Sequence, residues 1–496
     1  MTSSDNRSLA TGNSDQTTPA PQYSSRNTGV LAPQAVTSLS ETLNADASAR
    51  IAINAVTTTD VDKVALNRQR VISLDHSVSH KTDTWAVANQ KKSGRCWIFS
   101  GLNSMRGNVM SETGIKDFEL SQNYVSFYDK LEKANYFLTA MRELADRPIE
   151  DRTIQHLLQA PIDDGGQWNM FVALINKYGV VPQYAMPETQ SSSHTRQMNR
   201  DLASVLRAGA THIRKAVAED KENNADSDAV KAIHDDTMTS IYRILTIHLG
   251  VPPEKFVWQY RTKENEFVWK GTMTPQEIAA TYLPSDLDDY VCVVNDPRST
   301  SPYGDTFTVE YLGNVVGAKP VTYLNAPIEV LKKAAVGALV DGNPVWFGCD
   351  TLAQSNADQG YWSLDLYDYD DLYGVDLSMS KEDRLLSGDS MMTHAMVFTG
   401  VDLVDDSNDD FDPTSITSSD DLPEAVHPRR WRVENSWGPD KADKGFWTMD
   451  DSWFSENVYE IAVPKARLPK EYQDALSKEP HVLPAWDPMG ALAQTH

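Results

Sequence analysis

The sequence predicts an α+β fold, in which a helical half of the chain precedes a half built mainly of β-strands. After residue 96, apolar side chains recur at spacings of four, three and four, which places them on one face of an α-helix. After residue 290, runs of β-branched and aromatic residues bounded by Gly, Pro or Asp take over, and such runs are typical of strands. These runs lie at residues 290–294, 306–311, 345–349, 393–401, 431–434, 446–449 and 459–463. We therefore expect the second half of the chain to form a sheet.

Further helices are predicted in the first half of the chain. Ser121 is a suitable N-cap for an amphipathic run at 124–138, and a shorter apolar run at 170–175 ends in the helix-stopping order Lys-Tyr-Gly. Residues 191–249 are rich in Ala, Lys, Asp and Glu, with apolar residues at mostly helical spacings. We interpret the stretch from about 191–290 as a helical insertion.

The two ends of the chain differ from its body in composition. Residues 1–35 are rich in Ser, Thr, Asn, Gln and Pro and poor in large apolar residues, so they are predicted to be a disordered extension. Residues 36–67 carry apolar residues at every fourth position in part, which predicts a partly helical arm. The last segment, 480–496, contains Pro484 and Pro488 and is predicted to be an extended tail.

Composition and charge exclude several classes of function. The chain has 496 residues, 40% of them hydrophobic, but no apolar stretch approaches the roughly 20 residues that span a bilayer. The formal net charge of -25 argues against nucleic acid or an anionic membrane as a partner. The three cysteines have no paired spacing, so we expect no disulfide framework, no zinc site and a reducing location, the cytoplasm. The acidic stretch 405–424 lacks the glycine and the spacing of a calcium loop and is interpreted as a solvated surface loop.

Three residues from distant parts of the chain together have the chemistry of a thiol hydrolase. Cys96 begins a predicted helix, whose N-terminal N–H groups favour the reactive thiolate. His394 lies in a strand pattern, and Asn435 ends a later strand that is followed by Trp437. An asparagine carbonyl that accepts the imidazole N–H fixes the ring and leaves its other nitrogen facing a thiol. Each residue alone is typical of a protein core, but the set supplies a nucleophile, a base and an orienting residue.

With Gln90, these residues resemble the papain-like cysteine peptidases. The contexts that carry the resemblance are Gln90, Cys96-Trp97, His394-Ala395 and Asn435-Ser436-Trp437-Gly438. Longer segments are similar, in this order, to the branch of bleomycin hydrolases and bacterial aminopeptidases C: NQKKSGRCWIFSGLNSMRG, DGGQWNMFVALINKYGVVP, VCVVNDPR, VWFGCD, MMTHAMVF, RRWRVENSWG and LPAWDPMGALA. The interval from Cys96 to His394 is about twice the roughly 130–150 residues of papain-type enzymes, which again indicates inserted structure.

The resemblance implies a papain-like fold, with a helical half and an antiparallel β half. Residues 36–464 are then the catalytic domain, including the helical insertion at about 191–290. Residues 465–496 are then a C-terminal arm that reaches the active-site cleft.

The resemblance also implies roles for single residues. Cys96 is similar to the nucleophile of the family, His394 to its general base and acid, and Asn435 to the residue that orients the histidine. Gln90 takes the position of the oxyanion-hole donor, and a side-chain amide suits the negative charge that develops there. No cofactor and no metal are implied.

The implied activity is that of a cysteine aminopeptidase acting on peptides, in which the terminal carboxylate of the arm holds the amino group of the substrate. The implied assembly is a homohexameric ring. Because the chain continues past Ala493 as Gln494, Thr495 and His496, we expect the intact form to be a weaker aminopeptidase than a form ending near Ala493. The alternatives are a cysteine endopeptidase, if the tail does not fix the amino group, and a non-enzymatic ring-forming binding protein. An acyl transferase commonly orients its histidine with a carboxylate, which Asn435 disfavours.

Overall fold

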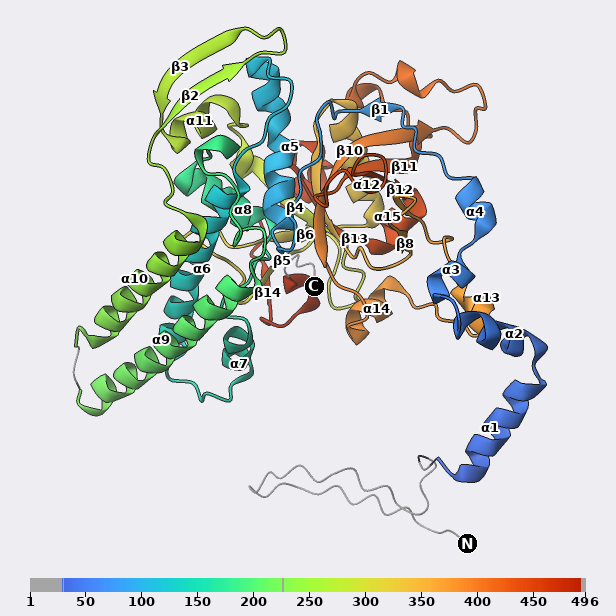
Figure 1. Cartoon of the computed structure of the whole chain (residues 1–496), viewed down its shortest axis with the longest axis horizontal. Coiled ribbons are helices and arrows are strands. Elements are labelled where there is room, and N and C mark those ends of the chain that lie inside the picture. Colours follow the sequence, from blue (N-terminus) through green and yellow to red (C-terminus); the bar gives the residue numbers. More distant parts are fainter. Residues whose placement is uncertain (1–28, 30, 225–226, 492–496) are drawn as a thin grey trace. The chain divides into compact units, whose positions relative to one another are not determined.

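The chain divides into two units, and the structure, a computed structural model, describes residues 29, 31–224 and 227–491 (Figure 1). The smaller unit comprises the described residues up to Leu66 together with Asp368–Leu377. The larger unit comprises Asn67–Tyr367 and the described residues from Ser378 onwards.

The smaller unit consists of short helices. They are α1 (Pro33–Ala45), α2 (Ala47–Val56), α3 (Val61–Ala65) and α13 (Tyr369–Tyr373). Asp46 caps α2 by accepting the backbone N–H of Ser48 at 2.8 Å, and the Tyr369 hydroxyl donates to Asp62 at 2.6 Å. The predicted helical character of residues 36–67 is confirmed. The helix begins slightly earlier than the predicted boundary, at Pro33, because proline is well suited to a first helical turn. Residues 1–28 and residue 30 of the predicted disordered extension lie outside the described residues.

The first half of the larger unit is helical, as predicted. Its helices up to the predicted insertion are α4 (Arg68–Ile72), α5 (Cys96–Thr113), α6 (Gln122–Glu143), α7 (Arg152–Gln159) and α8 (Trp168–Tyr178). The predicted cap of α6 is present, since the Ser121 hydroxyl accepts the backbone N–H of Tyr124 at 3.0 Å. Helix α5 carries a nearly all-round buried surface, including its first residue, Cys96. Such burial is expected of a helix at the centre of a protein.

The predicted insertion begins with two long helices and continues as a β-hairpin. The helices are α9 (Arg196–Glu222) and α10 (Ala229–Leu249), which pack against each other and against α6. The hairpin consists of β2 (Phe256–Arg261) and β3 (Phe267–Met273), and α11 (Pro275–Tyr282) follows it. Residues 256–273 are thus extended rather than helical. Phe256 and Trp258 point into the core and alternate with exposed positions, a period-two pattern that favours a strand.

The second half of the larger unit forms a twelve-stranded sheet, which contains all seven predicted strands. Its order is β14-β5-β6-β4-β13-β7-β10-β11-β12-β9-β8, with β1 beside β10. Pairs are antiparallel except β14–β5, β4–β6 and β12–β9. The strands are β1 (His80–Lys81), β4 (Tyr290–Val294), β5 (Thr306–Val309), β6 (Tyr323–Asn325), β7 (Val345–Cys349), β8 (Ser355–Asn356), β9 (Tyr361–Trp362), β10 (His394–Val404), β11 (His427–Glu434), β12 (Phe446–Asp450), β13 (Val458–Pro464) and β14 (His481–Leu483).

Four helices of the larger unit follow β4 in the sequence. They are α12 (Ile328–Val340), α14 (Lys381–Ser387), α15 (Asp451–Asn457) and α16 (Lys470–Ala475). Helix α12 packs against β10 and β13, and α15 packs against β11 and β12. The central strands are therefore buried on both faces, and every residue of β7 is buried.

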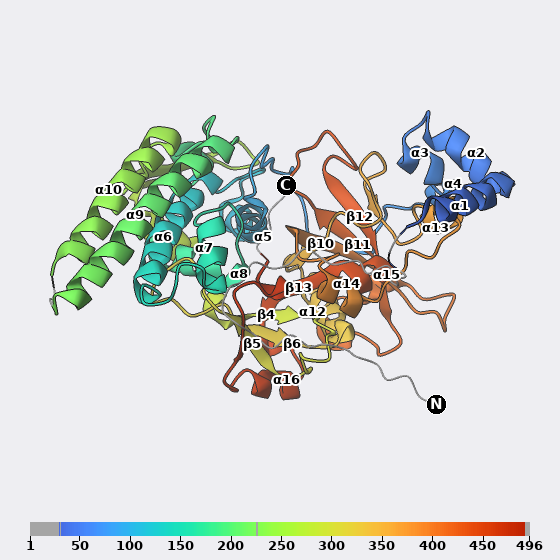
Figure 2. The same cartoon turned by 90° about the horizontal axis from the view of Figure 1, so that it is seen from below.

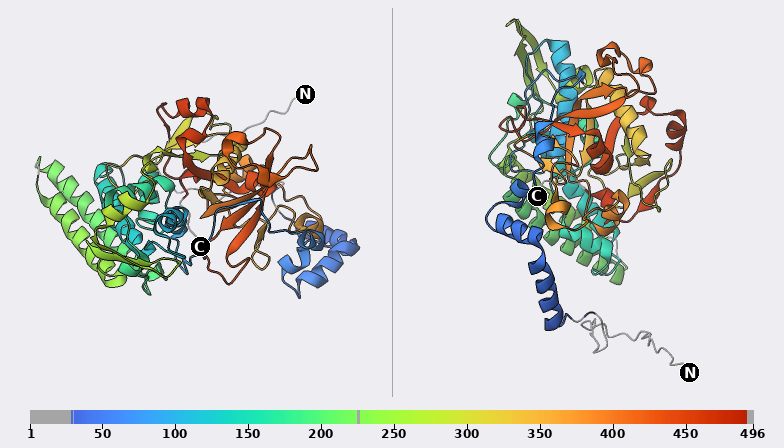
Figure 3. Two further views of the ribbon diagram at one scale, coloured as in Figure 1. Left: turned by 90° about the horizontal axis from the view of Figure 1, so that it is seen from above. Right: turned by 90° about the vertical axis from the view of Figure 1, so that its right-hand side faces the viewer.

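Helix α5 joins the helical half to the sheet. It packs against β10 and β7 on one side and against α6 and α8 on the other. Figure 2 shows α5 between the green and cyan helices and the orange strands, and the left panel of Figure 3 shows the same order from the opposite side. The N-terminus of α5 therefore lies where the two halves meet. No helix among residues 31–224 and 227–491 combines the length and the apolar character needed to cross a membrane.

Candidate active site

Cys96 is the first residue of α5, and its side chain has no exposed surface. The backbone N–H groups of Ala395, Trp97 and Cys96 itself lie close enough to the sulfur to favour its thiolate. Ser100, one turn further along α5, donates from its hydroxyl to the Ala395 carbonyl oxygen at 2.9 Å. The helix N-terminus is thus fixed to the beginning of β10, directly beside His394.

His394 is the first residue of β10 and is held by the residue predicted to orient it. Its Nε2 donates a hydrogen bond to Asn435 Oδ1 at 3.0 Å. The same Oδ1 accepts the Ser436 backbone N–H at 2.8 Å, which fixes the orientation of the amide and so the tautomer of the imidazole. The Trp437 ring covers the imidazole, with ring centroids 5.0 Å apart and an interplanar angle of 30°. The other nitrogen, Nδ1, makes no hydrogen bond within the part of the chain that the structure describes, so it remains an acceptor for a proton.

Gln90 lies against the same segment. Its backbone N–H donates to the Ser436 carbonyl oxygen at 2.8 Å, and its Oε1 accepts a hydrogen bond from the Ser436 hydroxyl. Its Nε2 donates to the Ser93 carbonyl oxygen at 2.6 Å. These contacts bind the residue predicted as oxyanion donor both to the loop before Cys96 and to the residue after Asn435. The four predicted residues therefore meet at one place, through Ala395 and Ser436.

Burial favours the neutral forms of the reacting groups. Desolvation raises the pKa of the Cys96 thiol to about 12, although the three backbone N–H groups oppose the change. Desolvation also lowers the pKa of His394 to about 4, although the hydrogen bond to Asn435 opposes it. In this closed arrangement the site therefore holds a thiol and a neutral imidazole at neutral pH.

The model of the Peptidase C1-like family matches residues 30–490. The chain belongs to this family. Human bleomycin hydrolase is 40% identical to it over 466 residues, which are 92% of this chain and 98% of that protein. Aminopeptidase C of Lactobacillus delbrueckii subsp. lactis is 40% identical over 446 residues, 89% of this chain and 94% of that protein. The crystal structure of PepW from Lactobacillus rhamnosis HN001 matches with a TM-score of 0.87 and 40% identity, covering 94% of this chain and all of that one.

These matches confirm the resemblance to bleomycin hydrolases and aminopeptidases C and the papain-like α+β fold. The chain is therefore a cysteine peptidase. The two further cysteines of this peptidase, Cys292 and Cys349, are buried free thiols. Within the described residues, no group of three or more His, Cys, Asp or Glu side chains is arranged to hold a metal ion.

The C-terminal arm of the peptidase is held along its described length. Strand β14 pairs with β5, and Arg298 donates two hydrogen bonds to Asp487, at 3.0 and 2.9 Å. At the end of the described chain, Gln167 Nε2 donates to the Ala491 carbonyl oxygen at 2.8 Å. Residue 166, beside Gln167, is a glycine whose place against the Trp97 ring leaves no room for a Cβ, which would lie 2.4 Å from the ring. The arm is thus bound to Gln167, whose neighbour Gly166 packs against Trp97, the residue after Cys96. Residues 492–496 lie outside the described chain.

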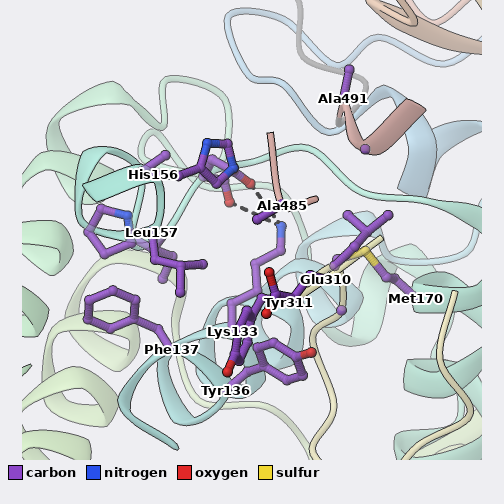
Figure 4. A pocket seen from close by; sticks show the side chains of 17 residues that line it. Lys133, Tyr136, Phe137, His156, Leu157, Met170, Glu310, Tyr311, Ala485 and Ala491 are labelled. Atoms are coloured by element: carbon purple, nitrogen blue, oxygen red, sulfur yellow. Dashed lines mark hydrogen bonds and ion pairs between the residues drawn. The ribbon is translucent and has the colours of Figure 1, made fainter. Parts of the chain in front are cut away.

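A cavity of about 240 Å³ lies beside this end of the arm, as Figure 4 shows. Ala485 and Ala491 of the arm line it, together with Tyr136, His156 and Tyr311 from the surrounding elements. Because residues of the arm form part of the cavity wall, movement of the arm would change the volume of the cavity.

Sequence reasoning missed two buried acids in the site. Glu434 directly precedes Asn435 and accepts hydrogen bonds from Trp85 and Asn103, each at 2.8 Å, and from Arg106. Asp164 contacts the loop before Cys96. The only local sequence signal for Glu434 is that it precedes a predicted site residue, and the only one for Asp164 is that it precedes a double glycine. Neither signal reveals the hydrogen-bond partners of the carboxylate.

Proposed function

We propose that the protein is a cysteine aminopeptidase that removes N-terminal residues from peptides through Cys96, His394 and Asn435. The observation that carries the proposal is the histidine geometry. Asn435 binds Nε2 at 3.0 Å and leaves Nδ1 as a buried acceptor, and the backbone N–H of Ala395, the residue after His394, acts on the Cys96 sulfur. The relatives named aminopeptidase C and bleomycin hydrolase support this assignment.

The arrangement suits acyl transfer by a thiol. Nδ1 of His394 takes the proton from Cys96, and Sγ forms a bond to the carbonyl carbon of the substrate. The imidazolium then gives its proton to the leaving amine as the C–N bond breaks, which leaves a thioester. A water molecule, deprotonated by Nδ1, attacks the thioester, and the proton returns to the departing sulfur. The Cys96 thiol and the His394 imidazole are both neutral before the substrate binds. The proton therefore moves from Sγ to Nδ1 in the complex with the substrate.

The tetrahedral intermediate carries negative charge on the former carbonyl oxygen, and we assign its stabilisation to Gln90 and the Cys96 backbone N–H. Replacing Gln90 by alanine is expected to lower kcat by about 100- to 1000-fold with a small change in KM, since the lost donor acts mainly in the transition state. Steady-state kinetics with an aminoacyl fluorogenic substrate measures both. A change confined to KM would contradict the role.

The pH dependence of kcat/KM tests the role of Asn435. The unprotonated His394 is the base, so activity of the wild type is expected to fall as the pH drops through the His394 pKa of about 4. Asn435→Asp adds a negative charge 3.0 Å from Nε2, which stabilises the imidazolium and moves this acid limb upwards by about 1 to 3 pH units.

Asn435→Ala is the matched control, because it removes the orienting oxygen without adding charge. Its kcat is expected to fall while its acid limb stays at or below that of the wild type. If both variants moved the limb upwards, the histidine would not be the group observed.

We further infer that the arm directs the enzyme to free N-termini. The two hydrogen bonds between Arg298 and Asp487 and the bond between Gln167 and Ala491 support this, because they fix the arm as far as the residue next to Gly166, which packs on Trp97. A fixed anion close to the scissile bond favours an ammonium group there and disfavours internal cleavage. A cysteine endopeptidase is the alternative if the arm has no such effect.

Removal of the arm after Leu483 tests this inference. The ratio of kcat/KM for an aminoacyl substrate to that for its N-acetylated form is expected to fall by about 10-fold or more, since a charge-assisted contact is worth roughly 1.5–3 kcal/mol. Cleavage of a longer N-acetylated peptide should appear at the same time. An unchanged ratio would favour the endopeptidase.

We propose that the chains form a homo-oligomer, as the family resemblance implies a hexameric ring. Large apolar side chains that are exposed in the single chain support this, among them Phe267 and Trp269 of β3, which are 57% and 61% exposed. Sedimentation velocity is expected to give one species of about six chains. A monomer across the micromolar range would contradict the proposal.

We also propose a cytoplasmic location. All three cysteines are free thiols, which is typical of a reducing compartment. Fractionation of cells that express the full chain tests it, and recovery with secreted proteins would contradict it.

A further inference from the structure

Asp164 lies in the turn before the double glycine, and its buried carboxylate binds three separate segments of the chain. One oxygen accepts the Gly94 backbone N–H at 2.9 Å and also the Thr195 hydroxyl. The other forms an ion pair with Lys130 at 2.7 Å and accepts from Asn199 Nδ2 at 2.8 Å. These partners belong to the loop before Cys96, to α6 and to the beginning of α9.

The same residue binds the other side of the nucleophile through its backbone. The Asp164 carbonyl oxygen accepts a hydrogen bond from Trp97 Nε1 at 2.6 Å. Gly94 and Trp97 lie on either side of Arg95 and Cys96. Asp164 therefore holds the nucleophile segment at both ends, and any displacement of the carboxylate moves Cys96 and its backbone N–H together.

The packing leaves little room for such a displacement. A Cβ at Gly94 would lie 2.9 Å from Asp164 Cβ, so the loop rests directly on the turn. Arg95 adds a second support, because it donates two hydrogen bonds to Glu188, at 3.0 and 2.6 Å. Lys92 donates from its backbone to the Ser193 carbonyl oxygen at 3.0 Å. Residues 188–199, where the insertion begins, thus support the nucleophile loop.

Charge keeps Asp164 ionised. Burial opposes ionisation, but Lys130 and the hydrogen bonds from Lys130, Thr195 and Asn199 hold the pKa of the Asp164 carboxyl well below its usual range. Lys130 has no exposed surface, and the neighbouring titratable groups are the ion pair of Lys133 with Asp163 at 3.1 Å and the neutral Cys96 thiol. The carboxylate is therefore the counter-ion of a buried ammonium as well as the acceptor for the loop.

We propose that Asp164 is a positioning residue for the reaction, which fixes Cys96 Sγ and the Cys96 backbone N–H relative to the substrate by joining the nucleophile loop to α6 and α9. The proposal rests on the proposed role of Cys96 as the nucleophile. It gives the helical insertion a part in catalysis, because Thr195 and Asn199 belong to the beginning of that insertion.

The expected effect is on kcat rather than on KM. A misplacement of the reacting atoms by about 1 Å costs roughly 100-fold in rate, and the loop carries the proposed nucleophile, Cys96. Asp164→Asn keeps the shape of the side chain and removes the charge. We expect it to lower kcat by about 30- to 100-fold with KM within about threefold.

The matched control is Asp402→Asn. Asp402 is a buried carboxylate that also forms ion pairs, with Arg429 at 2.7 Å and Arg430 at 2.9 Å, but it lies near the far end of β10. Both substitutions unbalance a buried ion pair, so both are expected to lower the thermal midpoint. When kcat is calculated per folded molecule, only Asp164→Asn is expected to lower it by more than about threefold.

A second readout follows the thiol itself. The Asp164 charge raises the pKa of Cys96, so its removal is expected to shift the pH profile of iodoacetamide alkylation towards lower pH. The Asp402→Asn profile is expected to match the wild type. A substitution that acted only on stability would not move this profile.

If Asp164→Asn does not fold, the double variant Thr195→Val with Asn199→Ala decides the matter, because it keeps the charge and removes the partners in α9. It is expected to lower kcat about 3- to 10-fold at unchanged KM. The inference is overturned if kcat in the folded Asp164 variant, or in this double variant, equals that of Asp402→Asn. Full activity of Cys96→Ser would instead overturn the proposed function, so the two failures are distinguishable.

Discussion

Replacement of Cys96 by serine is expected to lower kcat by about 10⁴-fold or more, because the loss of a nucleophile that acts with its base removes nearly all of their joint effect. The surroundings of residue 96 suit a thiol better than a hydroxyl group. The three backbone N–H groups at Sγ and the neutral imidazole suit a group that ionises far more readily than an alcohol. Activity on an aminoacyl substrate, with active-site titration by a thiol reagent, measures the loss.

Cys292→Ser is the control for this experiment. Cys292 is also a fully buried thiol, in β4, and donates to Asn169 Oδ1 at 3.1 Å, a contact that a serine hydroxyl can make as well. Its kcat is expected to stay within about threefold of the wild type. If Cys96→Ser kept the activity and Cys292→Ser lost it, the assignment of the nucleophile would be wrong.

The largest expected effect on stability comes from Arg106. This residue of α5 forms an ion pair with Glu434, and the two side chains are 1% and 0% exposed. Arg106→Met leaves the Glu434 carboxylate buried without its counter-ion, which typically costs about 3–5 kcal/mol of the free energy of unfolding. Because Glu434 precedes Asn435, kcat is expected to fall as well. Thermal and denaturant unfolding, followed by circular dichroism, measures the loss.

The loss of unfolding free energy in the Arg106→Met variant is also expected to depend on pH. Burial raises the pKa of Glu434 and Arg106 opposes this, so the pKa rises further in the Arg106→Met variant. A carboxyl whose folded-state pKa is raised contributes stability that is complete below its unfolded pKa and is lost as the pH rises through the folded pKa. The variant should therefore be closer to the wild type at pH 5 than at pH 8.

Two further variants define the cause. The double variant Arg106→Met with Glu434→Gln removes both charges and is expected to recover part of the loss. Lys231→Met breaks an exposed pair with Asp235, whose side chains are 75% and 57% exposed, and should cost far less stability than Arg106→Met because solvent screens the pair. Equal losses from Arg106→Met and Lys231→Met would show that burial of the ion pair does not matter.

Local sequence signals were sufficient for the elements that carry the candidate site. The apolar period after Cys96 predicts α5, and the β-branched runs predict the strands that present His394 and Asn435. These signals are strong because both kinds of element are buried and their side-chain periods are regular. Two-residue strands such as β1 and β8 have no period of their own, since their pairing is decided by the chain beside them. The hairpin at 256–273 was missed because it follows two helices whose charged, Ala-rich composition dominates the stretch.

The buried residues that hold the site in place could not be predicted from the sequence, for a different reason. Asp164 meets Gly94, Lys130 and Asn199 only because three elements converge, and no spacing along the chain encodes that. The same is true of the bond between Arg106 and Glu434. Burial of Cys96 and His394, and with it the direction of their pKa changes, also depends on the packed structure.

The complete burial of Cys96 has a chemical consequence for the resting molecule. Oxidants and alkylating agents react with thiolates, and both access and thiolate character set their rates. A thiol with no exposed surface and a raised pKa reacts slowly with both at neutral pH. The Cys96 sulfur of the peptidase is therefore protected against oxidation and alkylation at neutral pH, and its reaction with such agents becomes faster as the pH rises.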